Sequence, residues 1–484
     1  MIDRREFLAT GAALAGLRPV GGFVDPPAPF SPLPSPRQLA WHELEFYGFL
    51  HFTLNTFTNR EWGDGDESPA LFNPTDFDAD QIVGAAKNGG MKGLILTCKH
   101  HDGFCLWPSR YTEHSVKNSP FKRDVVKEIS EACARAGVKF GIYLSPWDRN
   151  HKDYGTPEYL TYYRNQLREL LTGYGPVFEI FFDGANGGDG YYGGAYERRE
   201  IDNRTYYDWP GTWQIVRQLQ PNTVLFSDAG PDIRWVGNER GVAGETCWAT
   251  QNSADFAPGH ADEARLNRGD RPGTNWVPAE CDVSIRPGWF YHKHEDGQVK
   301  TPQQLVDLYY SSVGRGASFL LNLPPDRRGR IPDPDVESLR GFRRIIDGTF
   351  TTNRAAGARV TASNWRGGRD RRFAPGNVLD GSRLTYWATD DDVRGPALML
   401  DLGKAVSFNV VRVREHLPLG QRVESIGVDM WQNGAWAEFG AATSIGNCRL
   451  IRGPRITTSR VRLRITRAAV CPAISEFGLF SEPS

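Results

Sequence analysis

Between residues 40 and 350, short apolar runs alternate with longer stretches in which apolar residues recur at helical spacing. A short apolar run bounded by turn residues is typical of a strand buried on both faces. The predicted strands are residues 47–52, 93–97, 139–144, 178–182, 223–227, 245–248 and 318–323. The clearest predicted helices are residues 79–87, 125–136 and 159–171, and Gly89, Gly90 and Gly137 stand where such helices end.

Strands that alternate with helices indicate βαβ units and a parallel sheet, so the fold class is α/β. The repeat count comes close to that of a (β/α)8-type barrel, which we favour over an open doubly wound sheet. No GxGxxG segment follows the first predicted strand, which removes the main reason to prefer a dinucleotide-binding fold. The barrel is assigned to residues 39–351.

The pattern changes after residue 351, where the helical spacing disappears. Short alternating runs take its place, at residues 397–402, 410–415, 427–431 and 461–465, with turn residues between them. Such a pattern is typical of an all-β sandwich of the jelly-roll kind. We therefore expect a second domain over residues 352–484.

The N-terminal 38 residues are predicted to lie outside both domains. Arg4 and Arg5 precede a short apolar run at residues 9–17, which is typical of a twin-arginine export signal. The run is too short to span a bilayer as a helix. Residues 18–38 are rich in Pro and Gly and are predicted to be a linker. We expect a periplasmic or secreted protein, the alternative being an N-terminus that is merely disordered or amphipathic.

Charge and cysteine content exclude several classes of function. The 57 basic and 58 acidic residues nearly cancel, so no basic field is present to bind nucleic acid or an anionic membrane. The 7 cysteines include no CxxC pair and no spacing typical of zinc. Buried free thiols are the favoured interpretation, with one or two disulfides as the alternative. We predict no metal site.

Polar and aromatic side chains follow the predicted strands at the positions where barrels carry their functional residues. In chain order these are His51, Glu61, Trp62, His100, His101, Tyr143, Trp147, Asp183 and Glu239. Each has a plainer explanation by itself, since an Asp can cap a helix, a lone Glu is usually solvated and a Trp usually packs. Adjacent histidines at a strand end point in opposite directions and rarely chelate one ion. Together, however, these residues indicate a polar site of sugar size.

Three segments resemble the α-L-fucosidases of glycoside hydrolase family 29. They are residues 48–52 (GFLHF), 97–107 (TCKHHDGFCLW) and 181–184 (FFDG). The resemblance covers about residues 40–350. Residues 230–239 (GPDIRWVGNE) and 286–292 (RPGWFYH) further resemble the subgroup that favours α-1,3/1,4-linked fucose on branched glycans. The family often has Trp where this chain has Phe181, which removes an indole N–H donor.

The resemblance implies a role for each candidate residue. It makes Asp183 the nucleophile and Glu239 the acid/base, with Glu245 as the reserve for the second role. The expected substrate-binding residues are His51, Glu61, Trp62, His100, His101, Tyr143, Trp147 and Trp289. The histidines would bind fucose hydroxyls, and Trp289 would pack on the methyl face of the sugar.

Two carboxyls are sufficient for the chemistry that this resemblance implies. A retaining glycosidase needs one ionised carboxylate and one protonated carboxylic acid about 5–5.5 Å apart. We expect apolar surroundings such as Trp235 to raise the pKa of Glu239. The expected enzyme is exo-acting, removes terminal fucose from fucosylated glycans and needs no cofactor. The alternatives are a lectin-like homologue without activity and a hydrolase of an α-galactose-like sugar.

The C-terminal segment resembles the discoidin-like domain of coagulation factors V and VIII. The supporting blocks are residues 360–363 (VTAS), 377–381 (NVLDG), 385–388 (TYWA), 400–403 (LDLG) and 474–480 (ISEFGLF). On glycosidases such domains are carbohydrate-binding appendages. Sugar binding, calcium binding and simple packing against the barrel all remain open for this domain.

Overall fold

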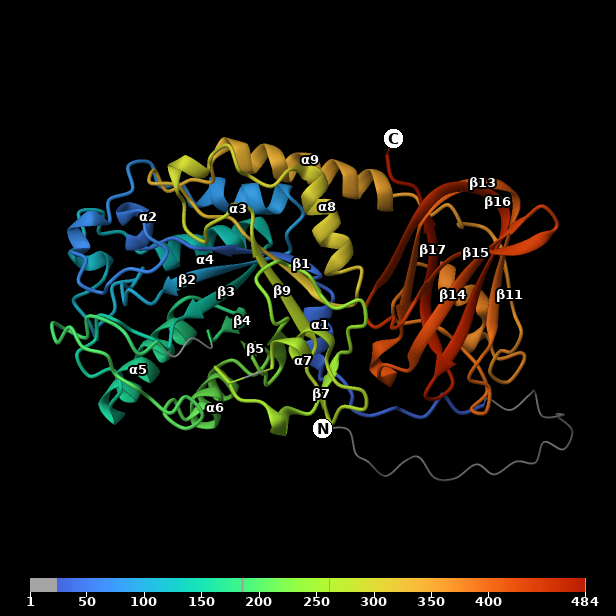
Figure 1. Cartoon of the computed structure of the whole chain (residues 1–484), viewed down its shortest axis with the longest axis horizontal. Coiled ribbons are helices and arrows are strands. Elements are labelled where there is room, and N and C mark those ends of the chain that lie inside the picture. The colour runs from blue at the N-terminus through green and yellow to red at the C-terminus, as the bar shows by residue number, and fades with distance from the viewer. Residues whose placement is uncertain (1–23, 184–186, 261, 484) are drawn as a thin grey trace, which may run out of the picture.

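The computed structural model describes residues 24–183, 187–260 and 262–483. A barrel surrounded by helices and an antiparallel β domain lie side by side, and helix α9 (Asp333–Phe350) reaches from the first to the second (Figure 1). No helix among the described residues is long and apolar enough to cross a membrane. All seven cysteines are buried and free.

The barrel is a closed sheet of eight parallel strands in the order β1-β10-β9-β6-β5-β4-β3-β2. These strands are β1 (Phe46–Leu50), β2 (Gly93–Lys99), β3 (Lys139–Leu144), β4 (Val177–Phe181), β5 (Val224–Ser227), β6 (Ile233–Trp235), β9 (Ala279–Ser284) and β10 (Ser318–Asn322). The predicted (β/α)8 barrel is therefore confirmed. Two small strands outside it, β7 (Thr250–Gln251) and β8 (Asn275–Trp276), pair with each other.

The predicted strand at residues 245–248 is wrong, and two barrel strands were missed. The segment is a loop whose Cys247 amide donates to Ser444 Oγ of the β domain at 3.4 Å, so its apolar residues face that domain. β6 is only three residues long and contains the buried Arg234. β9 directs acids into the barrel, among them Glu280 and Asp282. Neither strand has the apolar pattern by which the others are detected.

Four of the six main helices on the outside of the barrel begin where a side chain accepts a hydrogen bond from a backbone amide of the first turn. The main ones are α3 (Ala79–Asn88), α4 (Val125–Ala136), α5 (Pro157–Gly173), α6 (Trp209–Leu219), α8 (Pro302–Ser311) and α9. Asp124 caps α4 by accepting from the Lys127 amide, and Gly137 ends it at φ 69°, a left-handed conformation that favours glycine. The short helices are α1 (Pro36–His42), α2 (Leu54–Thr58) and α7 (Glu263–Arg268).

Alternate residues of each barrel strand point inward and form layers. The layer nearest the first residues of the strands is polar. In it, Tyr47 donates to Glu280, and the indole of Trp41 on α1 donates to Glu179 at 3.0 Å. One layer up, Phe49 and Phe181 pack against each other at 4.9 Å between ring centroids. One further step along the same strands places His51 and Asp183 at the rim. The alternation of side chains along the strands thus places the functional side chains at one end of the barrel.

The C-terminal domain is an antiparallel sheet folded around its own apolar core. Its order is β12-β17-β13-β16-β14-β15, with β11 paired to β13. The strands are β11 (Arg359–Ala362), β12 (Trp387–Ala388), β13 (Ala397–Glu415), β14 (Val423–Gln432), β15 (Ala435–Ala442), β16 (Arg449–Ala468) and β17 (Ala473–Phe480). The predicted runs 397–402 and 410–415 form one strand, because β13 continues through register shifts between them. Trp387, Phe408 and Phe477 lie in the core.

Ionic contacts and a Pro-rich segment connect the two domains. Glu45, just before β1, pairs with Arg383 and Arg414 of the β domain. Residues 24–35 run along the same domain, where Arg422 donates to the Ala28 carbonyl at 2.9 Å. The Pro-rich stretch is therefore held against the β domain over its described part.

Candidate active site

Asp183 lies two residues beyond the end of β4, at the rim where the inward-pointing side chains end. Tyr143 Oη donates to Asp183 Oδ2 at 2.8 Å, and His101 Nε2 lies 3.5 Å from the same oxygen. The side chain is 29% exposed, so an incoming molecule can reach it. Within the described residues it caps no helix, since the next helix, α6, is capped by Asp208. The geometry thus makes Asp183 an accessible carboxylate that receives a hydrogen bond from a buried tyrosine.

Three buried histidines form a cluster that reaches this carboxylate through His101. His51 Nδ1 hydrogen-bonds with Asn322 Oδ1 at 2.9 Å, and His101 Nδ1 with Ser145 Oγ at 2.7 Å. Burial lowers the pKa of His51 to about 3 and also lowers the pKa of His100 and of His101. Each ring is therefore neutral near pH 7 and offers one donor and one acceptor nitrogen. Such rings suit sugar hydroxyls, which also donate and accept.

Aromatic rings form the wall of the site. Trp147 is buried, with its ring 4.8 Å from that of His101, whereas Trp62 stands edge-on to Trp147 at 5.5 Å and is mostly exposed. Trp289 lies 5.0 Å from His51 between ring centroids. Phe181 stacks on Phe226 at 3.7 Å, below Asp183, so it packs in the barrel interior and donates nothing to the site.

Glu239 also belongs to the site, through Trp289. The Trp289 indole N–H donates to Glu239 Oε2 at 3.1 Å. Burial by the surrounding protein raises the pKa of Glu239, and the negative charges of Asp183 and Glu61 raise it further. Trp235, the expected neighbour, instead donates its indole N–H to Asp282 Oδ1 at 2.9 Å. The carboxyl of Glu239 is thus held by a different tryptophan from the one that its sequence neighbourhood suggested.

Glu61 connects two rim loops. Its Oε2 accepts from the Trp289 amide at 2.8 Å, and its Oε1 accepts from the Phe290 amide at 3.2 Å and lies 2.6 Å from His292 Nε2. Most of its hydrogen-bonding capacity is therefore used to hold the loop that carries Trp289. The structure places Glu61 beside the site, with an evident role in positioning that loop.

Glu245, the reserve candidate for the acid/base, is not in this site. Its side chain is 66% exposed and pairs with Arg315 at 2.8 Å and Arg449 at 3.5 Å, where barrel and β domain meet. The reason is the incorrect strand assignment, since residue 245 does not begin a barrel strand. Glu239, in contrast, lies near enough to Asp183 for that negative charge to raise its pKa.

Two residues of the KHHDGF segment support the fold and do not reach the site. Lys99 Nζ is fully buried and bonds to Asp148 Oδ2 at 2.9 Å and Gln166 Oε1 at 3.0 Å. Asp102 accepts from the Thr53 hydroxyl and the Phe104 amide, and burial raises its pKa to about 7. The segment therefore alternates supporting residues with the two histidines that it presents.

Asn322 and Ser145 are site-supporting residues that the sequence analysis did not single out. Asn322 ends β10 and orients His51, and it also donates to the Trp289 carbonyl at 2.7 Å. Ser145 follows β3 and orients His101. Both stand at the ends of predicted strands, so the strand-end rule that found the histidines could have found them as well.

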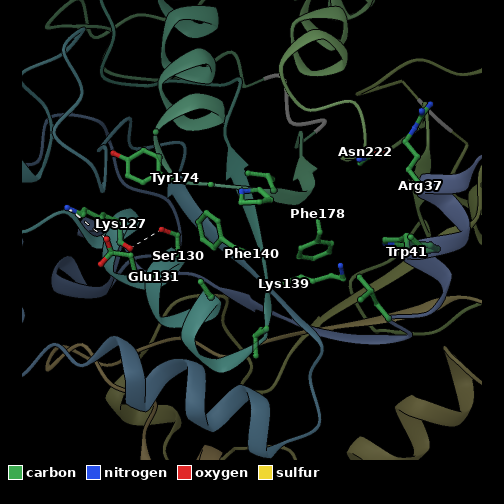
Figure 2. Close-up of a pocket in the computed structure, with 18 residues that line it drawn as sticks. Arg37, Trp41, Lys127, Ser130, Glu131, Lys139, Phe140, Tyr174, Phe178 and Asn222 are labelled. Atoms are coloured by element: carbon green, nitrogen blue, oxygen red, sulfur yellow. Dashed lines mark hydrogen bonds and ion pairs between the residues drawn. The ribbon is translucent and has the colours of Figure 1, made fainter. Parts of the chain in front are cut away.

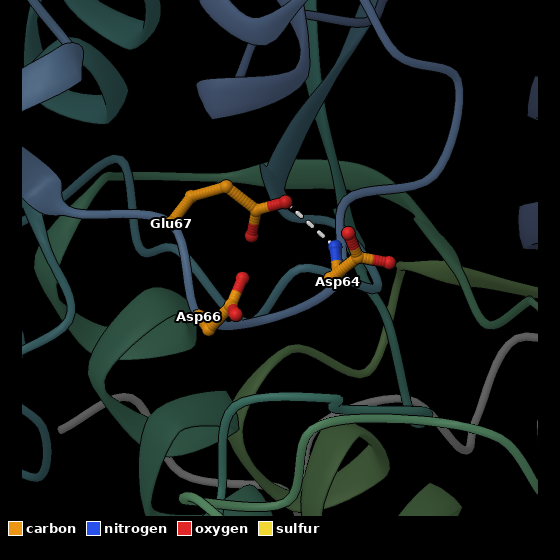
Figure 3. Close-up of side chains that lie close together, drawn as sticks. All are labelled: Asp64, Asp66 and Glu67. Carbon is orange, nitrogen blue, oxygen red and sulfur yellow. Dashed lines mark hydrogen bonds between the residues drawn. The ribbon is translucent and has the colours of Figure 1, made fainter. Parts of the chain in front are cut away.

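Two other features of the structure involve none of the predicted site residues. A largely apolar cavity of about 620 Å³ is lined by Trp41, Phe140 and Phe178, close to the first residues of β3 and β4 and hence at the opposite end of the barrel (Figure 2). Asp64, Asp66 and Glu67 cluster on the loop after α2 (Figure 3). Arg60 pairs with Asp64 and Glu67, so this acidic cluster is partly neutralised without a metal.

Comparison with known proteins assigns the chain to a family. A sequence model of the family described as alpha-L-fucosidase matches residues 38–346. The Arabidopsis thaliana protein "Alpha-L-fucosidase 1" is 44% identical over 464 residues, which cover 94% of this chain and 89% of that protein. The rice protein "Putative alpha-L-fucosidase 1" is also 44% identical, covering 94% and 86%.

Solved structures agree with the sequence comparison. A glycoside hydrolase 29 family member from an unknown rumen bacterium has 42% identity and a TM-score of 0.84, covering 94% of this chain and 78% of that one. A Ruminococcus gnavus GH29 fucosidase in complex with fucose has 32% identity and a TM-score of 0.85, covering 96% and 97%. The barrel, the carboxyl and histidine cluster at its rim, and these relatives lead to one conclusion: the chain belongs to the α-L-fucosidases of glycoside hydrolase family 29.

Proposed function

We propose that this α-L-fucosidase is exo-acting and retains the anomeric configuration, with Asp183 as nucleophile and Glu239 as acid/base. The observation that carries the proposal is the contrast between the two carboxyls. Tyr143 donates a hydrogen bond to Asp183, which stabilises its negative charge, whereas burial and two nearby carboxylates raise the pKa of Glu239. Carboxyls whose environments differ in this way suit the separate roles of nucleophile and acid.

The reaction would proceed in two displacements. Asp183 attacks the anomeric carbon of fucose while Glu239 gives its proton to the departing glycosidic oxygen, which forms a covalent fucosyl-enzyme. Glu239, now ionised, takes a proton from a water molecule that attacks the same carbon and releases Asp183. Each step inverts the carbon, so the product keeps the α configuration. The two carboxyls suffice for both steps, and no cofactor enters the scheme.

The neutral histidines support specificity for the hydroxyl pattern of the sugar. His51, His100 and His101 would hydrogen-bond to fucose hydroxyls, and a sugar that lacks the matching hydroxyl would leave buried nitrogens unpaired. An apolar wall such as Trp289 discriminates the methyl group by only about 1–3 kcal/mol. Residues 230–239 support a preference for terminal α-1,3/1,4-linked fucose. The Arabidopsis thaliana and Ruminococcus gnavus relatives are named as fucosidases, which does not favour a galactose-like substrate.

Matched variants test the assignment of the acid/base. Glu239→Gln should lower kcat on a fucosylated oligosaccharide by about 10²- to 10⁴-fold, because the leaving oxygen then receives no proton. Glu245→Gln is the control, since Glu245 pairs with arginines away from Asp183, and it should retain wild-type kcat. Equal losses in the two variants would contradict the assignment of Glu239.

The nucleophile and the stereochemistry need separate measurements. Asp183→Asn should abolish fucose release, and retention of the wild-type rate would disprove the role of Asp183. Proton NMR during hydrolysis of an aryl α-L-fucoside should detect α-fucose before mutarotation produces the β anomer. If β-fucose appeared first, the two-displacement scheme would be wrong.

Export from the cytoplasm is a further part of the proposal. The Arg4-Arg5 pair lies outside the described residues, and its sequence supports a periplasmic or secreted enzyme. Replacing both arginines by lysine should shift fucosidase activity from the periplasmic to the cytoplasmic fraction of a bacterial host. An unchanged distribution would argue against twin-arginine export. Carbohydrate binding by the C-terminal domain also stays a prediction.

A further inference from the structure

Two large aromatic side chains are exposed on loops at the rim of the barrel. Trp62, on the loop after α2, is 59% exposed, and Tyr196, on the loop between β4 and α6, is 72% exposed. Aromatic rings of this size usually bury most of their surface when packing is their only role. Tyr196 also has φ 50°, in the left-handed region that a bulky residue seldom adopts, and such strain persists where the surrounding structure enforces it.

Both rings belong to loops that are joined directly to the active site. The Trp62 ring lies 5.8 Å from the ring of His101, the histidine that contacts Asp183. Tyr196 Oη donates to Asp66 Oδ2 at 3.4 Å, and Asp66 is four residues after Trp62 on the same loop. The rim is therefore continuous from the nucleophile, through Trp62, to Tyr196.

Arg149 fixes the two loops relative to each other. Its amide donates to the His101 carbonyl at 2.9 Å, its guanidinium donates to the Gly63 carbonyl, and its own carbonyl accepts from the Tyr192 amide. Tyr191 packs edge-on against Tyr196 at 4.9 Å and orients that ring. The two exposed rings are thus held in place by the frame that also positions His101.

Asp66 differs from the other two acids of its cluster (Figure 3). Arg60 and Arg149 pair with Asp64, Arg60 also pairs with Glu67, and Glu67 accepts from two backbone amides. Among the described residues, no basic side chain pairs with Asp66, which is exposed beside Tyr196. Its exposed carboxylate can accept hydroxyl donors beside the ring of Tyr196.

We propose that Trp62, Tyr196 and Asp66 form the subsite for the sugar ring to which the fucose is attached. This inference rests on the proposed function and extends it beyond the fucose pocket. The C–H face of a pyranose can stack on an aromatic ring, and Asp66 can accept from a ring hydroxyl. The negative charge of Asp66 favours a neutral sugar, because a sulfated or sialylated ring would be repelled.

The test compares two substrates that share fucose and differ in the leaving group. One is fucose α-1,3-linked to N-acetylglucosamine, and the other is α-L-fucosyl fluoride, whose leaving group is too small to reach Tyr196. The measured quantity is the ratio of kcat/KM on the disaccharide to kcat/KM on the fluoride. Tyr196→Ala should lower this ratio about 10-fold, and Asp66→Asn about 5-fold, through loss of stacking and of a charged acceptor.

Tyr111→Ala is the matched control. Tyr111 is also an exposed tyrosine, but the adjacent Arg110 amide donates to Glu169 of α5, a helix on the outside of the barrel. This variant should keep the wild-type ratio. If Tyr196→Ala and Asp66→Asn also keep it, the subsite is disproved. If the wild type hydrolyses neither substrate, the proposed function fails, and the two failures are therefore distinguishable.

Discussion

The hydrogen bond from Trp289 to Glu239 predicts how a single substitution changes the pH dependence of activity. Trp289→Phe keeps an aromatic ring beside His51 and removes the indole N–H that lies 3.1 Å from Glu239 Oε2. That donor stabilises the ionised form of Glu239 and so lowers its pKa against the raising effect of burial. Its removal should raise the pKa of Glu239 further. Because Glu239 must be protonated in the first step, the basic limb of the kcat/KM profile should move to higher pH.

The size of the effect follows from the exposure of Glu239. A hydrogen bond to a charged group contributes about 1.5–3 kcal/mol when it is buried. The carboxyl of Glu239 is partly open to solvent, so water replaces much of the lost donor and about 1 kcal/mol is the appropriate scale. At a pH below the limb, kcat/KM should therefore fall about 5-fold through poorer positioning of the acid.

The assay is kcat/KM on an aryl α-L-fucoside across the pH range, for the wild type and for two tryptophan variants. Trp235→Phe is the matched control, because its indole N–H donates to Asp282 and not to Glu239. It should lose thermal stability, since a buried acceptor loses its donor, without displacing the basic limb. If Trp289→Phe left the basic limb where the wild type has it, the assignment of this hydrogen bond to acid/base control would be refuted.

Two further predictions concern buried charges. Lys99→Met should lower the free energy of unfolding by about 3–5 kcal/mol, because Asp148 would be left buried without its cation. Urea denaturation measures the free energy of unfolding, and a loss below about 1 kcal/mol would contradict this prediction. Glu179→Gln should flatten the dependence of stability on pH. Burial raises the pKa of Glu179 above 4.5, so the stability that protonated Glu179 contributes to the folded state is complete below pH 4.5. That stability is lost as the pH rises through the folded-state pKa of Glu179. Melting temperatures of wild type and variant between pH 4 and 8 measure the difference, and parallel curves would disprove the reasoning.

The elements with regular hydrophobic patterns were predicted closely. Helix α4 has the predicted bounds, and six of the seven predicted barrel strands overlap observed ones. β6 and β9 were missed because Glu280 and Asp282 replace apolar side chains in the barrel interior, and Arg234 replaces one on the outward face of β6, where it meets α7. Their polar groups are satisfied by partners distant in sequence, such as the Leu266 carbonyl for Arg234, and such partners leave no periodic signal.

The active-site residues also divide into those that the local sequence pattern predicts and those that depend on partners distant in sequence. Asp183, His51, His100, His101 and Tyr143 were found because each stands at or just beyond a strand end, and the structure brings them together. The neighbours of Glu239 could not be found in this way. Trp289 reaches Glu239 from 50 positions away in sequence, whereas the nearby Trp235 turns to another acid.

The sequence alone determined the barrel, the β domain and the set of strand-end residues, because strand and helix periods are local properties and barrel closure sends every strand end to the same rim. Only the tertiary structure decided which glutamate lies in the same site as Asp183. Glu239 and Glu245 are six residues apart and equally acidic, yet one contacts Trp289 and the other pairs with arginines between the domains. The different placement of the two glutamates depends on how separate loops pack in space, and the local sequence pattern does not predict that packing.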